Sequence, residues 1–101
     1  MAGRYFLRQK AKEDLMEIGR YTSKTWGRKQ RDAYLAALYK CFEKLAAGGL
    51  HVQDCSHILP GYKRYHCQRH LIFFKDTVDG DVDIIRVLHQ AMHVKDRLLG
   101  R

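Results

Sequence analysis

Hydrophobic and polar residues along this chain follow two different periods, and the first covers its N-terminal half. From Lys10 or Ala11 to about Trp26, and again from Arg28 to Ala47, apolar residues recur every three to four positions, which predicts two amphipathic helices. A single glycine, Gly27, separates the two segments, so we expect an antiparallel helical hairpin. The pair Gly48-Gly49 ends the second helix.

The same spacing predicts which side chains enter the core. On the first helix they are Ala11, Leu15, Ile18 and Tyr21, with Trp26 at the edge of the stripe, and on the second they are Tyr34, Leu38, Cys41, Phe42 and Leu45. We expect Trp26 to be buried, because a large aromatic side chain that closes an apolar helix face commonly belongs to the core. The nearby basic residues, which form a solvated face able to attract DNA or an acidic partner, are Lys24, Arg28, Lys29 and Arg31.

The C-terminal half carries short apolar runs bounded by turn residues, which predict strands. The predicted strands are Tyr62–Cys67, His70–Lys75 and Val82–His89, with an edge strand at Arg4–Arg8, turns at Gln68-Arg69 and Asp79-Gly80, and a loop at Leu50–Pro60. Alternation places Val82, Ile84, Arg86 and Leu88 on one face of the last strand. The predicted fold is α+β in the order β-α-α-β-β-β: a single domain over residues 1–101, with an antiparallel sheet packed against the helical hairpin.

The composition of the chain indicates its cellular location and the kind of partner that it binds. No stretch approaches the roughly 20 apolar residues of a membrane span, and no signal peptide is visible, so we expect a cytoplasmic location without membrane contact. The three cysteines, Cys41, Cys55 and Cys67, form no C-x-x-C pair, and we expect reduced thiols. The net charge of +8 favours an anionic partner, either nucleic acid or an acidic protein.

The C-terminal strands hold the candidate chemistry. An unpaired arginine is costly to bury, so Arg86, within an apolar strand, needs a partner or water. If Arg64 and Arg86 leave the same sheet face with His66 nearby, they form a cationic patch. Such a patch either binds an acidic partner or supports RNA cleavage, which needs cations and a positioned acid and base. The residues of suitable type are Lys63, Arg64, His66, Arg69, Arg86, His89 and His93.

Two further features of the sequence bear on function. Neither cluster of histidine and cysteine has the full spacing of a zinc site, and no metal or other cofactor is expected. The apolar residues of the tail, which include Met92, Val94, Leu98 and Leu99, allow two interpretations. The tail is either a short helix that packs back on the sheet or a protruding element that engages a target.

Four short motifs, taken together, resemble a known family. They are W-G at Trp26-Gly27 followed by Gln30 and Tyr34, G-Y-K at Gly61–Lys63, H-L-I-F-F at His70–Phe74, and I-I-R-V-L-H-Q-A-M at Ile84–Met92. In this order they resemble the ParE-type toxins of the RelE/ParE superfamily, from the first strand to about Val94. The resemblance implies a toxin of a type II toxin–antitoxin module that binds and inhibits DNA gyrase and so blocks replication. It also implies a cognate ParD-like antitoxin with an acidic segment, through which alone the toxin contacts operator DNA.

The resemblance implies binding without catalysis, for which we expect target or partner contacts from Arg64, Arg86, His89 and Met92. The grooves beside the helices are then expected to hold the antitoxin. The alternative is a RelE-like, ribosome-dependent mRNA endoribonuclease, with the two arginines on phosphate and His66 or His89 as acid or base. RelE-type chains place a Tyr or His close to the chain end, whereas this chain ends in DRLLGR, which favours the ParE branch. A third possibility is a chain that has lost toxicity and serves only as the antitoxin's partner in repression.

Overall fold

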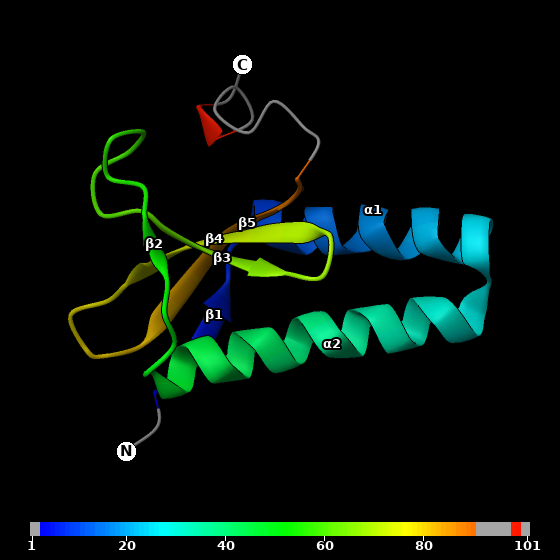
Figure 1. Ribbon diagram of the computed structural model, residues 1–101, viewed down its shortest axis with the longest axis horizontal. Coiled ribbons are helices and arrows are strands. Elements are labelled where there is room, and N and C mark those ends of the chain that lie inside the picture. The colour runs from blue at the N-terminus through cyan, green and yellow to red at the C-terminus, as the bar shows by residue number, and fades with distance from the viewer. Residues whose placement is uncertain (1–2, 91–97, 100–101) are drawn as a thin grey trace.

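The computed structural model describes residues 3–90 and 98–99, and its elements follow the predicted order (Figure 1). They are β1 (Tyr5–Leu7), α1 (Gln9–Trp26), α2 (Arg28–Ala47), β2 (Gln53–Asp54), β3 (Lys63–Cys67), β4 (His70–Asp76) and β5 (Val82–His89). The α+β fold class is confirmed, and both helices and the three long strands lie where the sequence predicts them. The exception is β2, since this short strand lies in the segment predicted as a loop.

The five strands form one sheet in the order β1-β5-β4-β3-β2. Strands β2 to β5 are antiparallel to their neighbours, whereas β1 runs parallel to β5 and pairs Tyr5 with Val82 and Leu7 with Ile84. The sheet is therefore mixed, so the prediction of an antiparallel sheet is wrong for the pair β1 and β5. A parallel pair needs a long connection, and the helical hairpin together with the other strands provides it.

The helical hairpin packs against the sheet, and the main core lies between them. Its larger buried side chains are Leu15, Leu38, Phe42, Ile72, Phe74 and Ile84. A smaller buried cluster of Cys55, Phe73 and Leu88 also forms, and Leu98 of the C-terminal segment packs against it. Because Phe73 alternates with Ile72 and Phe74 along β4, this cluster lies on the opposite face of the sheet.

A bulge changes the side-chain alternation of β5. Phe74 pairs with Ile84 and Phe73 pairs with Arg86, so Ile85 is an extra residue without a partner on β4. The alternation therefore reverses within the strand. Ile84 belongs to the main core and Leu88 to the opposite cluster, so the prediction that these two residues share a face is wrong.

The apolar stripe of α1 is only partly buried. Ala11, Leu15 and Ile18 are buried as predicted, but Tyr21 is 68% and Trp26 67% exposed. Figure 1 shows the reason: the far end of the hairpin extends past the sheet, so no strand covers it. The predictions that Tyr21 and Trp26 belong to the core are therefore wrong. Neither helix, among the residues that the structure describes, is long and apolar enough to cross a membrane.

Gly27 makes the sharp connection between the helices. Its φ is +94°, a left-handed conformation that favours glycine, and its N–H donates to the carbonyl of Ser23 at 3.0 Å. The hydrogen bond closes the last turn of α1, and α2 begins at the next residue. The predicted one-glycine hairpin is confirmed.

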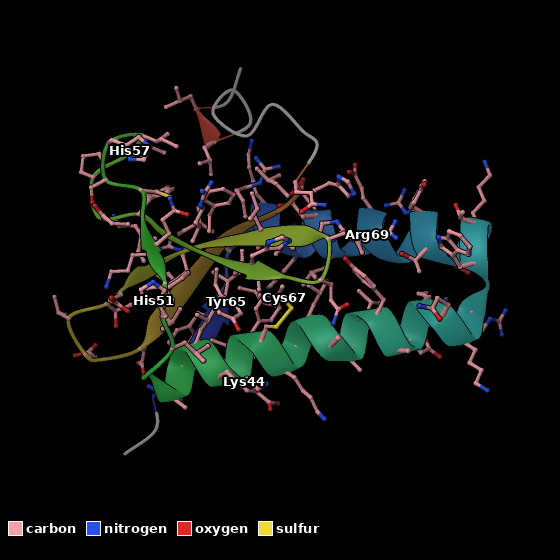
Figure 2. The ribbon with its side chains drawn as sticks, in the orientation of Figure 1. Lys44, His51, His57, Tyr65, Cys67 and Arg69 are labelled. Carbon is pink, nitrogen blue, oxygen red and sulfur yellow. A yellow bond between two sulfur atoms is a disulfide. The ribbon has the colours of Figure 1, made fainter. Side chains whose placement is uncertain are left out.

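A disulfide joins Cys41 of α2 to Cys67 of β3, with the two Cα atoms 6.6 Å apart (Figure 2). The expectation that all three thiols are reduced is therefore wrong for this pair. Cys55 is the free cysteine, and it is buried in the smaller cluster. The bonded cysteines are 26 residues apart in sequence, and they meet because α2 packs on β3.

Candidate interaction grooves

Two grooves run along the helical hairpin. The inner groove, of about 850 Å³, is lined by Asp14, Glu17, Ile18, Tyr21, Thr22, Trp26, Gln30, Tyr34, Gln68, Arg69, His70, Arg86, Val87, Leu88 and His89. The outer groove, of about 970 Å³, is lined by Leu7, Lys12, Leu15, Met16, Gly19, Arg20, Ser23, Lys24, Arg31, Asp32, Leu35 and Tyr39. At about 3.6 residues per turn, the two sets of residues lie on opposite flanks of the buried stripe of α1.

An ion pair between α1 and β5 forms one wall of the inner groove. The Nε and the second terminal nitrogen of Arg86 donate to the two carboxylate oxygens of Asp14 at 2.8 and 2.9 Å. Their side chains are only 14% and 11% exposed. The hydrogen bonds to Asp14 raise the pKa of Arg86 above its ordinary value. Arg86, which needs a partner or water according to the sequence, has Asp14 as its partner.

Asp14 also completes the edge of the sheet. Strand β1 pairs with β5 only as far as Ile84, so β5 continues past the end of its neighbour. Beyond that point the backbone N–H of Val87 donates to a carboxylate oxygen of Asp14 at 2.9 Å. An unpaired strand edge exposes backbone donors, and this carboxylate satisfies one of them together with the arginine.

A tyrosine and two histidines line the same groove. The backbone N–H of Arg69 donates to the Tyr34 hydroxyl at 3.1 Å, and this hydroxyl lies 2.5 Å from Nδ1 of His70. His70 pairs with His89 across the strands, with ring centroids 5.3 Å apart. Burial, followed by the neighbouring His89, lowers the pKa of His70 to about 4. His70 is therefore neutral near pH 7, and its Nδ1 shares a hydrogen bond with the Tyr34 hydroxyl.

The predicted site residues do not gather at one point. Arg64 and Arg86 both pair with Phe73, so they lie in one row across the sheet, as expected if they share a face. Arg64, however, donates to the side chain of Gln53 at 2.8 Å, on the far side of β4 from the inner groove. His89 lines the inner groove beside Arg86. Met92 lies outside the described residues, so its predicted contact stays a prediction.

Sequence reasoning did not identify Asp14 or Tyr34 as part of a site. In the sequence, Asp14 is one of several acidic residues in the first half of a helix, and Tyr34 is a member of an apolar stripe and of the W-G motif. A signal for Asp14 existed, because a buried arginine in β5 requires a carboxylate from a neighbouring element. The sequence did not show which of the nearby acids would reach it.

The sequence of this chain is similar to known proteins over nearly its whole length. A family model described as the ParE toxin of the type II toxin–antitoxin system, parDE, matches residues 5–94. Toxin ParE1 of Mycobacterium tuberculosis is 36% identical over 97% of this chain and 100% of its own length. Toxin ParE of Escherichia coli is 32% identical over 96% of this chain and 94% of its own, and Toxin ParE1 of Caulobacter vibrioides is 34% identical over 93% and 96%.

A solved structure shares the fold at low sequence identity. It is described as the chromosomal ParDE TA system from P. aeruginosa, and its matching chain superposes with a TM-score of 0.69 at 15% identity, covering 87% of this chain and 96% of that one. The likeness extends over the helical hairpin and the sheet together, as the coverage requires. With the family model and the relatives spanning nearly its whole length, the chain belongs to the ParE toxin family of type II toxin–antitoxin systems.

Proposed function

We propose that this toxin inhibits DNA gyrase by binding to it, and that it blocks replication without catalysing a reaction of its own. Membership of the ParE family supports a bound macromolecular target. The net charge of +8 supports a target that is itself engaged with DNA, because a basic surface is attracted to such an assembly. The site of action is then the bacterial cytoplasm.

The observation that carries the proposal is the pairing of Arg86 with Asp14. A nuclease needs a cation free to stabilise the charge that develops on phosphate. Both oxygens of the Asp14 carboxylate are hydrogen-bonded to this guanidinium, so its charge is compensated within the protein. The arginine that sequence reasoning offered as a phosphate ligand thus fixes α1 to β5. We expect it to act by holding the groove in shape beside His89.

Target contacts are assigned to Arg64, His89 and Met92, with Arg86 as the residue that positions this end of β5. Arg64 is partly exposed on β3, next to the short edge strand β2, where its side chain can reach a partner. His89 lies at the end of β5 in the inner groove. A contact surface that includes both Arg64 and His89 would extend from β3 across the sheet to the inner groove.

The second partner is a cognate ParD-like antitoxin, which neutralises the toxin and carries any contact with operator DNA. The solved structure of similar fold comes from a ParDE system, which supports such a partner. An acidic antitoxin segment would complement the basic charge of this chain. We place it on the helical hairpin, whose grooves are open.

The test is a supercoiling and cleavage assay with purified gyrase. The wild-type toxin should trap cleaved DNA on gyrase and stop supercoiling. The variants Arg64→Ala and His89→Ala should each weaken the effect by about tenfold, the loss expected when one good polar contact is removed. Lys44→Ala, on α2 (Figure 2) and outside both grooves, is the control and should act as the wild type does. Unimpaired supercoiling at high toxin excess would reject the proposal.

One observation favours the rival activity, a ribosome-dependent ribonuclease. The contact between the Tyr34 hydroxyl and His70, with His89 adjacent, is an arrangement that could carry a proton. Primer extension on translated messages after induction of the toxin separates the two functions. Cuts in register with codons, lost in His70→Ala and His89→Ala, would establish the ribonuclease; intact messages would exclude it.

A further inference from the structure

The tip of the helical hairpin, which we define as residues 20–31, carries a dense positive charge. Its basic residues are Arg20, Lys24, Arg28, Lys29 and Arg31, and no acidic residue lies among them in the sequence. Arg31 pairs with Asp32 at 2.9 Å, whereas the other four form no ion pair within residues 3–90 and 98–99. The charge of the hairpin tip is therefore available to an anionic partner.

Two large aromatic side chains are exposed at the same end of α1. Tyr21 is 68% and Trp26 67% exposed, because the hairpin tip extends past the sheet (Figure 1). Both line the inner groove. The residues from Thr22 to Thr25 that separate them are polar or charged, so the two rings form no continuous apolar strip. Separate aromatic rings among basic side chains are typical of surfaces on which nucleic-acid bases stack.

We infer that the hairpin tip binds single-stranded DNA, with bases stacked on Tyr21 and Trp26 and phosphates paired with the basic residues beside them. The two aromatic residues are five positions apart, which is about 7.5 Å along the helix axis at about 1.5 Å per residue. This separation is more than twice the roughly 3.4 Å rise of one strand in duplex DNA. In a duplex each base face is covered by the next base pair, so only an unstacked single strand can offer bases to both rings.

Arg69 adds a cation on the opposite wall of the inner groove. It lies in the turn between β3 and β4 (Figure 2), and it is exposed. Its backbone N–H donates to the Tyr34 hydroxyl at 3.1 Å, which fixes the turn beside α2. Glu17, which is exposed in the same groove one turn before Tyr21, would repel phosphate. The binding site therefore ends at Tyr21 and opens toward the hairpin tip.

Other occupants fit the hairpin tip less well. A second copy of this chain would bring a protein of charge +8 against a basic surface. An acidic peptide would satisfy the cations, but its carboxylates would leave the faces of the two rings uncovered. We choose DNA over RNA because the proposed target acts on DNA, and in this choice alone the inference rests on the proposed function.

The fluorescence of Trp26 tests the stacking directly. Trp26 is the only tryptophan of the chain, so its emission reports on this site alone. Titration with a 20-mer oligothymidylate should quench this emission, since a stacked base contacts the indole ring. Unchanged emission at a saturating concentration of the oligonucleotide would overturn the inference.

Substitutions at the same position separate stacking from charge. With a fluorescein-labelled oligothymidylate, Trp26→Ala should raise the dissociation constant by about tenfold, and Trp26→Phe, which keeps an aromatic face, by less than about threefold. The matched control is Phe6→Ala on β1. Phe6 is 45% exposed and lies 5.4 Å below the guanidinium of Arg4, but it is remote from the hairpin tip, so its removal should leave the constant unchanged. Circular dichroism checks that each variant is folded.

A second pair of variants tests the phosphate contacts. Arg28→Gln/Lys29→Gln should make the dependence of the logarithm of the dissociation constant on the logarithm of salt concentration shallower by about 1.4, at about 0.7 per lost contact with a single strand. Lys40→Gln/Lys44→Gln removes the same charge from exposed positions of α2 outside both grooves and should leave this slope unchanged. Equal slopes in the two double variants would overturn the inference.

Competing ligands and the gyrase assay complete the test. The inference would be wrong if a duplex of the same length or a polyglutamate peptide bound as tightly as the oligothymidylate, or if a 20-mer oligouridylate bound at least tenfold more tightly. The gyrase assay is run in parallel on the wild type. Oligonucleotide binding at Trp26 without gyrase inhibition would reject only the proposed target, and gyrase inhibition without oligonucleotide binding would reject only this site.

Discussion

The two flanks of α1 differ in how their polar side chains are satisfied. On the inner flank, the carboxylate of Asp14 binds Arg86 and the backbone of Val87, and Tyr34 on the facing helix bonds to His70. On the outer flank, Lys12, Arg20 and Lys24 line a groove with exposed apolar residues and have no ion pair in the described chain.

The difference follows from which element lies opposite each flank. The inner flank faces the ends of β4 and β5, which bring polar partners from distant parts of the chain. The outer flank faces α2 and Leu7 of β1, and the acidic residue of α2 that lines this groove, Asp32, already pairs with Arg31. The polar side chains of the inner flank are thus satisfied within the protein, whereas the three cations of the outer flank form no ion pair among the described residues.

Removal of Asp14 should have the largest effect. Asp14→Ala leaves a largely buried guanidinium and the Val87 N–H without this carboxylate, and we expect the free energy of unfolding to fall by about 3–5 kcal/mol. Urea denaturation measures it. Glu17→Ala, on the same flank but exposed, should change the value by less than about 0.5 kcal/mol. Equal losses in the two variants would contradict the internal role of the ion pair.

The disulfide should contribute nearly as much on the sheet-facing side of α2. Reducing the bond between Cys41 and Cys67 frees a loop of 26 residues, which should lower the free energy of unfolding by about 3 kcal/mol. Thiol titration of the denatured, unreduced chain should find only Cys55. Three reactive thiols in that titration, or denaturation curves unaffected by reductant, would contradict this prediction.

A pH dependence should mark the inner groove. In the window from pH 6.5 to about 4, the unfolded chain protonates His70 while the folded protein does not. The unfolded state then binds more protons, so the free energy of unfolding falls as the pH drops through this window. Solvent screens the half-buried ring, and we expect a loss of about 1–2 kcal/mol.

Two variants isolate the contribution of this histidine. His70→Phe should flatten the profile between pH 6.5 and 4, because it removes the titrating group. His57→Gln, in the exposed loop between β2 and β3 (Figure 2), should leave the profile of the wild type unchanged. Parallel profiles for the wild type and His70→Phe would assign the acid sensitivity to another group.

The smallest effect is expected at the floor of the outer groove. A Cβ at Gly19 would lie 3.5 Å from Leu35 and 3.8 Å from Arg31, which is ordinary contact. Gly19→Ala should therefore raise the free energy of unfolding by about 0.5–1 kcal/mol, through helix propensity. Gly27→Ala should lower it by about 1 kcal/mol, because its φ of +94° is unfavourable for alanine. A destabilised Gly19→Ala protein would show that the helices need closer contact there.

Much of the architecture could be predicted because its signals are local. The three-to-four-residue period from residues 11 to 26 and 28 to 47, the glycines at 27 and 48, and the turn at Asp79-Gly80 specify elements within a few positions of themselves. The order of these elements, with the four short motifs taken together, is sufficient to indicate the family. The candidate site was predicted less well, because Asp14 and Tyr34 enter it from elements remote in the sequence.

The chain's own pattern determined the helical hairpin, the three long strands, the basic charge and the need of Arg86 for a partner. Tertiary structure alone decided that the partner is Asp14, that Cys41 and Cys67 meet, that β1 runs parallel to β5, and that Trp26 is exposed. The physical reason is that the periodicity of the sequence indicates the direction in which a side chain leaves its own backbone. Burial and pairing depend instead on which other segment of the chain packs opposite that side chain in the fold.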